Sequence, residues 1–384
     1  MPSFTRYSKG LSLIEMMVAV LIASFLIFGL LQVFTASKAS YQTAEGMARV
    51  QENARFAMDF LQRDIRMAGH FGCVNDQAHW VKEEGDPALS LGSVASGSGA
   101  PLDFSMSIEG YEAPSSGPTQ SLTLGGAWAA PTGAPTLTPA PVGGSDILVL
   151  RYFAPEGVPV SAIAPAGSGE IVQFTAGRWN SLTSDGVTAP TLYGVSDCTH
   201  ANVFTGSGAA GAVVTTGASS GLAARYTPAP TGQTMLYRAD AIAYYVGING
   251  QGNPALYRAR AGAGNTFAGG EELVEGIQSL QLLFGQDERA VLSLDTPPIG
   301  NITRYNTAAD IRALGAADVP NAWRRVGVVQ VGILAVSPNL AAAPAAQGPI
   351  RVLGTSFQPA AAGDARYRGS YESTVALRNR LFGN

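Results

Sequence analysis

Residues 11–34, LSLIEMMVAVLIASFLIFGLLQVF, form an apolar run that a single charge, Glu15, interrupts. As a helix, these residues would extend about 36 Å, which exceeds the roughly 30 Å hydrocarbon core of a bilayer. The ten residues before the run carry two basic side chains, Arg6 and Lys9, and no acidic one. Basic residues on this side predict a cytoplasmic N-terminus and an exported remainder.

Two ordinary interpretations of this run each leave a feature unexplained. A plain transmembrane anchor accounts for the length, but not for Glu15, because a carboxylate at membrane depth is costly and usually functional. A cleavable secretory signal could end at Ser37-Lys38-Ala39. The run is, however, longer than the roughly 7–15 apolar residues of such signals.

The residues at the start of the run support a third interpretation. Lys9-Gly10, followed by the sequence LSLIE of residues 11–15, resembles the type III signal of type IV pilins and type II secretion pseudopilins. The resemblance implies that a prepilin peptidase cuts the Gly10–Leu11 bond on the cytoplasmic face and that residues 1–10 are a leader. Leu11 would become the N-methylated first residue, where phenylalanine is commoner, and Glu15 would take the fifth mature position, where the family has its glutamate.

A carboxylate at Glu15 also has a physical use in such a protein. Cleavage would leave the free amine of Leu11 as a cation in a medium of low dielectric constant. Pairing this amine with the carboxylate of a neighbouring subunit would neutralise both charges and set the axial register between subunits. The alternative is a stray glutamate at the edge of the helix.

Residues 35–68 continue the helical pattern, but here the apolar residues occupy one face of the helix. Apolar residues recur at intervals of three or four and form one stripe: Met47, Val50, Ala54, Met58, Leu61, Ile65 and Ala68. Glu45–Arg49 and Asp59–Arg63 have the i,i+4 spacing of helical ion pairs, and Gly69 is suited to end the helix. We expect one spine helix over residues 11–69, with the stripe packed on a sheet.

The sequence within the stripe and after it narrows the resemblance to one group of pilins. Residues 48–57 (ARVQENARFA), 64–69 (DIRMAG) and 70–73 (HFGC) resemble the PilW-type minor pilins of type IV pili, with weaker similarity at 147–152, 256–258, 272–277 and 377–379. This resemblance implies a structural protein rather than an enzyme, anchored once in the inner membrane with its body in the periplasm. Its partners would be prepilin peptidase, other minor pilins and the major pilin. Its place would be a subcomplex that starts pilus assembly, at the tip, in support of adhesion, twitching motility or DNA uptake.

The body, residues 70–384, is expected to be rich in strands. Residues 85–145 and 205–235 are dense in Gly, Ser, Pro, Ala and Thr, so we interpret both as large loop insertions. Strands are predicted at 146–153, 280–284, 326–336 and 371–377, with a hairpin formed by 241–247 and 255–260. A long helix followed by strands without regular intervening helices favours an α+β fold on an antiparallel sheet.

Cys73 and Cys198 are the only cysteines in the chain. An even pair in an exported protein usually forms a disulfide, and closing so long a loop would contribute about 4–5 kcal/mol on the entropy model. Two buried free thiols are the alternative.

The chain offers little that indicates catalysis, a cofactor or a metal. The G-x-S-x-G match at 217–221 lies in a low-complexity stretch with every histidine before it, which is the wrong order for a hydrolase triad. The G-x-G-x-x-G match at 206–211 has no βαβ context. His70, His79 and His200 fit no zinc spacing with the cysteines, and residues 286–289 have too few alternating carboxylates for calcium. A net charge of −4 gives no basic patch, so we expect no specific nucleic-acid binding.

Two rival functions remain open at this point. A type II secretion pseudopilin shares the signal and the fold, although the body here is longer than that role usually requires. A membrane-tethered periplasmic binding protein or enzyme, with an accidental match to the signal, is the rival of another class.

Overall fold

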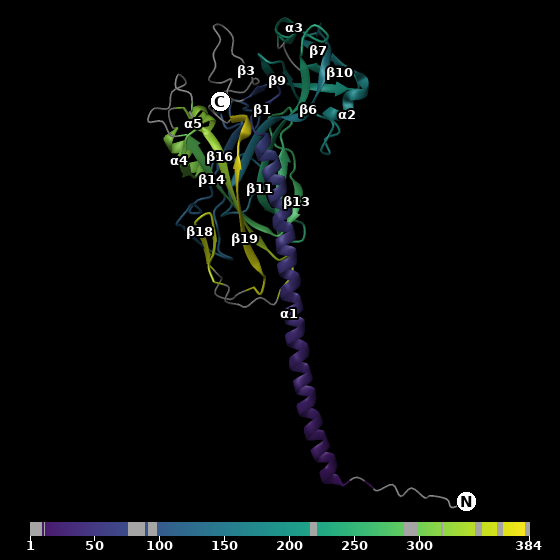
Figure 1. Cartoon of the computed structure of the whole chain (residues 1–384), viewed down its shortest axis with the longest axis vertical. Helices are drawn as coiled ribbons and strands as arrows, with labels where there is room; N and C mark the ends of the chain where they lie inside the picture. The colour runs from purple at the N-terminus through teal and green to yellow at the C-terminus, as the bar shows by residue number, and fades with distance from the viewer. Residues whose placement is uncertain are drawn as a thin grey trace, which may run out of the picture.

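The chain folds into one long helix and a strand-rich body around the C-terminal half of that helix (Figure 1). The computed structural model describes residues 10, 12–75, 89–90, 98–215, 221–287, 298, 300–315, 318–341, 348–358 and 364–380. Helix α1 (Leu13–Met67) has 55 residues, and its length is about 82 Å. It ends at the expected place: Ala68 is the C-cap, and Gly69 follows in a left-handed conformation with φ of 76°.

Two antiparallel sheets form the body beside α1. The first has the strand order β13-β12-β11-β6-β4, and the second has the order β15-β14-β16-β19. The strands of the first sheet are β4 (Ile108–Tyr111), β6 (Ile147–Ala166), β11 (Met235–Ile248), β12 (Pro254–Arg260) and β13 (Glu271–Glu275). The strands of the second sheet are β14 (Ile277–Asp287), β15 (Ile302–Asn306), β16 (Val326–Val336) and β19 (Arg368–Ala376).

The main hydrophobic core lies between these two sheets and α1. Its members come from the helix stripe, from β6, β11 and β12 of the first sheet, and from β14, β16 and β19 of the second. Helix α1 contacts the edge strand of each sheet, β13 and β19, and Figure 1 shows these strands on either side of it. The chain therefore has an α+β fold in which the spine helix closes one side of the paired sheets.

Short elements cover the rest of the paired sheets. Helices α4 (Ala308–Leu314) and α5 (Val319–Arg324) contact β4 on the side away from α1. A small three-stranded sheet of β17 (Ile350–Val352), β18 (Thr355–Gln358) and β5 (Ser121–Thr123) packs on Leu334 of β16. The remaining short elements are β1 (His70–Phe71), β2 (Val74–Asn75), β3 (Leu89–Ser90) and η3 (Arg378–Arg380).

The strands β6 and β11 continue beyond the first sheet into a closed barrel. Each of six strands pairs antiparallel with the next in the ring β6-β7-β10-β9-β8-β11, and β11 pairs back to β6. The barrel has its own apolar core, separate from the main one. Its other elements are β7 (Gly169–Phe174), η2 (Ala176–Arg178), α2 (Trp179–Leu182), β8 (Leu192–Ser196), β9 (Ala201–Ala209), β10 (Ala212–Thr215) and α3 (Leu222–Arg225). Figure 1 shows the barrel at the end of the body farthest from the N-terminus.

The strands predicted from the sequence are present, and some are longer than expected. The strand 326–336 coincides with β16, and β11 and β12 form the expected hairpin. The strand expected over 146–153 is instead the first part of β6, which has 20 residues. Pro155 and Pro159, which argue against a strand when the sequence is read alone, both lie within it.

The two stretches interpreted as large loop insertions, 85–145 and 205–235, also contain short regular elements. The first contains β3, β4 and β5, and the second contains the end of β9, all of β10 and α3. Glycine in these strands serves close packing rather than a turn. A Cβ added at Gly110 in β4 would lie 2.6 Å from the ring of Phe284, and one at Gly208 in β9 would lie 2.4 Å from the hydroxyl of Tyr193.

Candidate functional site

The start of α1 carries the residues that the sequence assigned to processing and assembly. Ser12 is the N-cap: its Oγ accepts a hydrogen bond from the backbone N–H of Glu15, at 3.2 Å. In return, the Glu15 carboxylate accepts one from the backbone N–H of Ser12, at 3.0 Å. This capping box fixes Glu15 in the first turn of the helix, where a negative charge is favourable. Gly10 is exposed with no other group within 4 Å of a Cβ added to it, and Leu11 lies outside the described residues.

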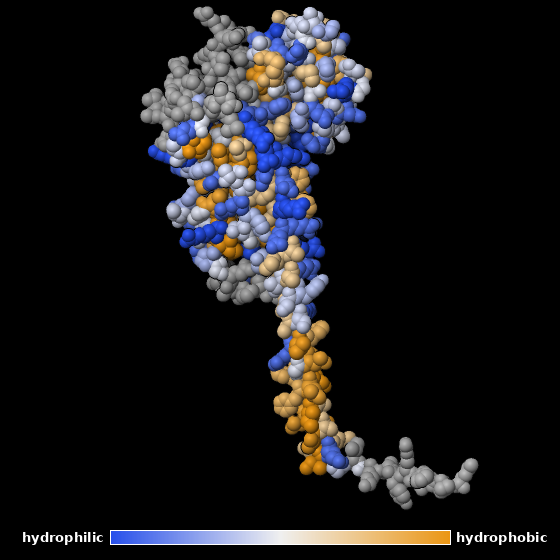
Figure 2. All heavy atoms as spheres, in the orientation of Figure 1, coloured by the Kyte–Doolittle hydropathy of each residue, from blue (hydrophilic) through white to orange (hydrophobic). Residues whose placement is uncertain are grey.

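The next 20 residues of α1 form a stem without any cover. An 18-residue window of the helix has a mean hydropathy of 2.6, and none of this window is buried. Figure 2 shows apolar side chains around the visible face of this stem below the body. A bare apolar stem of this length is suited to a membrane and, later, to contact with other apolar helices.

Thr43 and Gly46 form the first close contact between α1 and the body. The hydroxyl of Thr43 donates a hydrogen bond to the carbonyl of Ala341, at 2.8 Å. Gly46 is buried against the same residue, so closely that an added Cβ would lie 2.5 Å from the Cβ of Ala341. Met47, which we expected in the buried stripe, is 38% exposed because Gly46 takes the inward position instead.

A buried polar cluster near the end of α1 forms a second contact between the helix and the body. The hydroxyl of Tyr244 in β11 donates to Asp64 Oδ2, at 2.6 Å, and Arg258 Nη1 in β12 lies 3.4 Å from the same oxygen. Burial and the Asp64 carboxylate hold the pKa of the Tyr244 hydroxyl well above its ordinary value. The expected ion pair of Arg63 with Asp59 is wrong: Arg63 Nε lies 3.1 Å from Asp64 Oδ1. The Glu45–Arg49 pair is present, at 3.6 Å.

Sequence reasoning missed Asp64, although the sequence contained a signal for it. Asp64 is 3% exposed and lies between the stripe members Leu61 and Ile65. A lone carboxylate within an apolar helix stripe needs a partner on the facing sheet, because an unpaired buried charge is strongly unfavourable.

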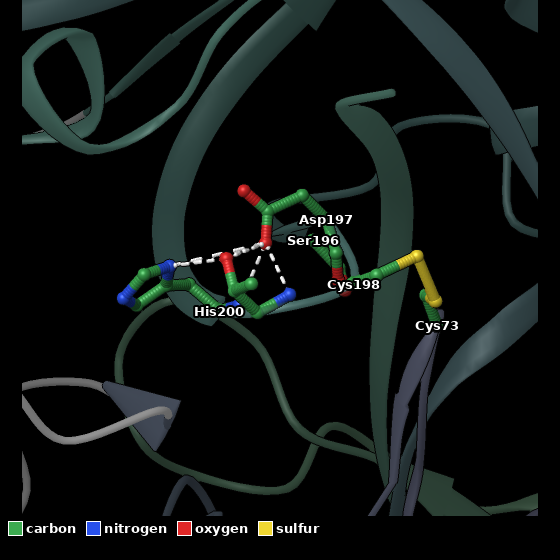
Figure 3. The surroundings of a disulfide bond; sticks show 6 residues. Cys73, Ser196, Asp197, Cys198 and His200 are labelled. Atoms are coloured by element: carbon green, nitrogen blue, oxygen red, sulfur yellow. Dashed lines mark hydrogen bonds and ion pairs between the residues drawn. A yellow bond between two sulfur atoms is a disulfide. The ribbon is translucent and has the colours of Figure 1, made fainter. Parts of the chain in front are cut away.

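The two cysteines form a disulfide that joins the chain just after α1 to the barrel. Cys73 follows β1, and Cys198 lies in the turn between β8 and β9, with a Cα–Cα distance of 4.8 Å. Figure 3 shows Asp197 and His200 beside this bond, with the His200 ring directed away from the sulfur atoms. Asp197 Oδ1 accepts backbone hydrogen bonds from Thr199, at 2.7 Å, and from His200, at 2.6 Å. The turn that presents Cys198 is thus held by Asp197.

The described residues among those considered for catalysis or metal binding each make structural contacts of their own. His70 contacts the carbonyl of Phe153 through Nδ1, at 3.0 Å, and His79 lies outside the described residues, as do 217–220 of the G-x-S-x-G match. The G-x-G-x-x-G match covers the end of β9 and the turn to β10, and it opens no helix. Gln286 donates to the carbonyl of Ala322, and residues 288–289 are not described. Among the described residues, no group of three or more His, Cys, Asp or Glu side chains is placed to hold a metal.

The N-terminal part of α1 is apolar and exposed, and its C-terminal half closes an antiparallel α+β body. This is the architecture of a pilin-like protein. Residues 243–379 match the type IV pilus-assembly protein W family, and residues 5–31 match the prokaryotic N-terminal methylation motif. The two matches are those of a PilW-like type IV minor pilin and confirm the resemblance seen in the sequence. Both families are structural components of pili rather than enzymes. No significant match is found among curated proteins or solved structures.

Proposed function

We propose that this protein is a minor pilin that is incorporated into a type IV pilus through α1. The observation that carries the proposal is the combination of the two family matches with an uncovered apolar stem of α1. The stem would hold the precursor in the inner membrane with the body, residues 70–384, in the periplasm. During assembly the same stem would pack against the stems of other minor pilins and the major pilin.

Processing would take place at the start of α1. Prepilin peptidase would remove residues 1–10 by cutting the Gly10–Leu11 bond and would methylate the amine of Leu11. Glu15 would then pair with the N-terminal amine of a neighbouring subunit and set the register between them. Its carboxylate is exposed and lies at the helix N-terminus, where another chain can reach it.

The position within the pilus follows from the family. We place the protein in the minor-pilin subcomplex that initiates assembly and remains at the tip, where it would support adhesion, twitching motility or DNA uptake. The match over residues 243–379 favours a pilus over a type II secretion pseudopilus.

Replacing Glu15 tests this proposal. In a pilus-forming host, Glu15→Ala should be processed at Gly10–Leu11 yet be absent from sheared pili, because the register pair is lost. Glu45→Ala is the matched control, since Glu45 is an exposed carboxylate of the same helix that pairs with Arg49 one turn away. Its amount in sheared pili should equal that of the unchanged protein. Incorporation of Glu15→Ala at the level of the control would contradict the register role.

A further inference from the structure

The barrel forms a lobe of its own, which we define as residues 157–237. It lies outside both stretches that match known families. Its six strands close into a ring, and its core is built from its own residues. Only five of its 81 residues are Asp, Glu, Lys or Arg. A closed ring with a separate core retains its structure without support from the neighbouring sheet.

Two strands, β6 and β11, carry the chain between the body and this barrel lobe, and their pairing is irregular at the crossing. In β6, Phe153 pairs with Ala239 and Gly157 pairs with Tyr237, so three residues of β6 lie opposite Arg238 alone. Such a bulge interrupts the ladder of hydrogen bonds and bends the strands. We call this crossing, residues 153–157 and 237–239, the neck.

Arg238 lies at the centre of the neck, and its side chain bonds to residues on both sides. It is 2% exposed, and its Nε donates to Asp240 Oδ2 on the body side, at 3.0 Å. Its Nη1 donates to the carbonyl of Ser184 in the barrel lobe, at 2.6 Å. Asp240 is held in turn by Arg260, at 2.7 Å. These bonds define one orientation of the lobe on the body.

The Cys73–Cys198 disulfide is the third covalent connection between the two parts. Cys73 belongs to the body and Cys198 to the barrel lobe, and both residues are exposed. Beneath them, an apolar cluster joins Phe71 and Phe153 of the body to Leu192 and Val203 of the lobe. The disulfide therefore adds a covalent link to an interface that the apolar cluster, the Arg238 bonds and the short pairing of β3 with β9 already hold together. Exposed disulfides are the ones that reductants reach most readily.

We propose that the Cys73–Cys198 bond is a redox-sensitive strap that fixes the barrel lobe on the body, and that its reduction lets the lobe pivot at the neck without unfolding. The reductant is a dithiol. One of its thiolates attacks a sulfur of the bond and forms a mixed disulfide, and its second thiol then displaces that sulfur. Two electrons and two protons pass to Cys73 and Cys198, and the dithiol becomes a disulfide. This inference does not depend on assembly into a pilus.

Hydrogen exchange of the purified full chain, before and after reduction with dithiothreitol, tests the strap. Reduction should raise the exchange of the neck amides, those of residues 153, 154, 156, 157 and 237–239, by about tenfold or more, because opening there no longer has to strain a covalent link. Amides of β7 and β10, which lie within the barrel and away from the neck, should change by less than about twofold. A double variant, Cys73→Ser with Cys198→Ser, should show the raised neck exchange without any reductant.

Two results would overturn the proposal. Unchanged exchange at the neck after complete reduction would mean that the strands, the Arg238 bonds and the apolar cluster fix the lobe by themselves. An equal rise across β7, β10 and the neck would mean that the bond is needed for folding of the lobe and is not a strap. Because the unchanged protein is reduced after folding, the test remains decisive even if the double variant is not produced. Where the variant is produced, dithiothreitol should leave its exchange unaltered.

Discussion

Asp64 shows how one residue determines where the spine helix sits on its body. Its carboxylate is shared between the hydroxyl of Tyr244 and the guanidinium of Arg258, which belong to neighbouring strands. Arg258 also contacts Glu271 in β13, at 3.1 Å, so the cluster links the helix to three strands of one sheet. Sliding α1 by a single residue would rotate Asp64 away from all of these partners.

We expect Asp64→Ala to lower the free energy of unfolding of the body by about 3–5 kcal/mol, because it removes the buried carboxylate that faces Arg258 and Tyr244 and leaves Arg258 with the largely exposed Glu271. Tyr244→Phe removes one hydrogen bond and should lower it by about 1–2 kcal/mol. Asp59→Ala, an exposed carboxylate of the same helix, should stay within about 0.5 kcal/mol of the unchanged protein. Denaturant unfolding in detergent measures all three, and equal effects of Asp64→Ala and Asp59→Ala would contradict the role of the cluster.

A second residue-scale feature is a pair of carboxyl groups, the half-buried Glu112 and the buried Asp146. Asp146 accepts hydrogen bonds from the backbone N–H groups of Ala113 and Leu282, each at 2.9 Å. Burial raises the pKa of Glu112 from 4.5 to about 9, with the Asp146 carboxylate as the next largest cause and Asp310 as a smaller one. Burial also raises the pKa of Asp146, although its hydrogen bonds oppose this.

This pair predicts that the body loses stability as the pH rises. The unfolded chain releases the Glu112 proton near pH 4.5, whereas the folded chain holds it until about pH 9. Between these values the unfolded state binds fewer protons, so each rise in pH favours unfolding. The free energy of unfolding should fall from about pH 5 to about pH 9, and Glu112→Gln should flatten that slope. A Glu112→Gln variant with the slope of the unchanged protein would show that Glu112 titrates normally.

At the scale of elements, the position of Gly46 sets where the helix leaves the body. Before Gly46 no described residue of α1 is fully buried, and Thr43 bonds to Ala341, whereas after Gly46 the stripe from Val50 onward is buried. The glycine is needed because Ala341 approaches the helix axis so closely. Alanine is ordinarily the better helix former by about 1 kcal/mol, so helix propensity and packing oppose each other here.

We expect the packing effect to outweigh helix propensity, so that Gly46→Ala lowers the melting temperature of the body. The reason is the 2.5 Å approach between the new Cβ and that of Ala341, which the surrounding structure has to relieve. Gly29→Ala is the matched control, because nothing lies within 4 Å of a Cβ added there. Thermal unfolding in detergent should leave the control unchanged or slightly more stable. A rise in melting temperature for Gly46→Ala would mean that the contact yields easily.

The elements also show what sequence patterns can and cannot predict. The helix, its end at Gly69 and the strand β16 were predictable, because apolar periodicity and a glycine stop are local signals. The barrel was not predictable, since its strands carry Pro155, Pro159 and Gly208, which locally favour turns. Only tertiary contacts, such as that of Gly208 with Tyr193, explain why these residues occur in strands.

The same distinction applies to the candidate site. Gly10, Leu11 and Glu15 were proposed from the sequence because their spacing forms a motif that needs no tertiary information, and they remain a prediction. The capping box of Ser12 with Glu15 was within reach of the same pattern. Asp64 and Arg238 were missed because each acts through residues far away in the chain, such as Tyr244 and Ser184.

At the scale of the whole molecule, three parts follow one another along one axis. The uncovered stem of α1 comes first, then the paired sheets around its C-terminal half, and then the barrel lobe at the far end (Figure 1). This order places the stem, which is suited to contacts with a membrane and with other subunits, at the opposite end of the molecule from the barrel lobe. In the proposed filament, the stem would be covered by other subunits, whereas the barrel lobe would remain outside.

Mass spectrometry of the N-terminal peptide, from the protein expressed in a pilus-forming host, tests the central claim most directly. We predict a peptide that begins at Leu11 and carries one added methyl group on its amine, because prepilin processing would cut after Gly10 and retain the stem. A peptide that begins at Met1 or Pro2 would indicate a plain anchored protein, and one that begins near Ser40 would indicate a secreted one. Either of these results would contradict the pilin account.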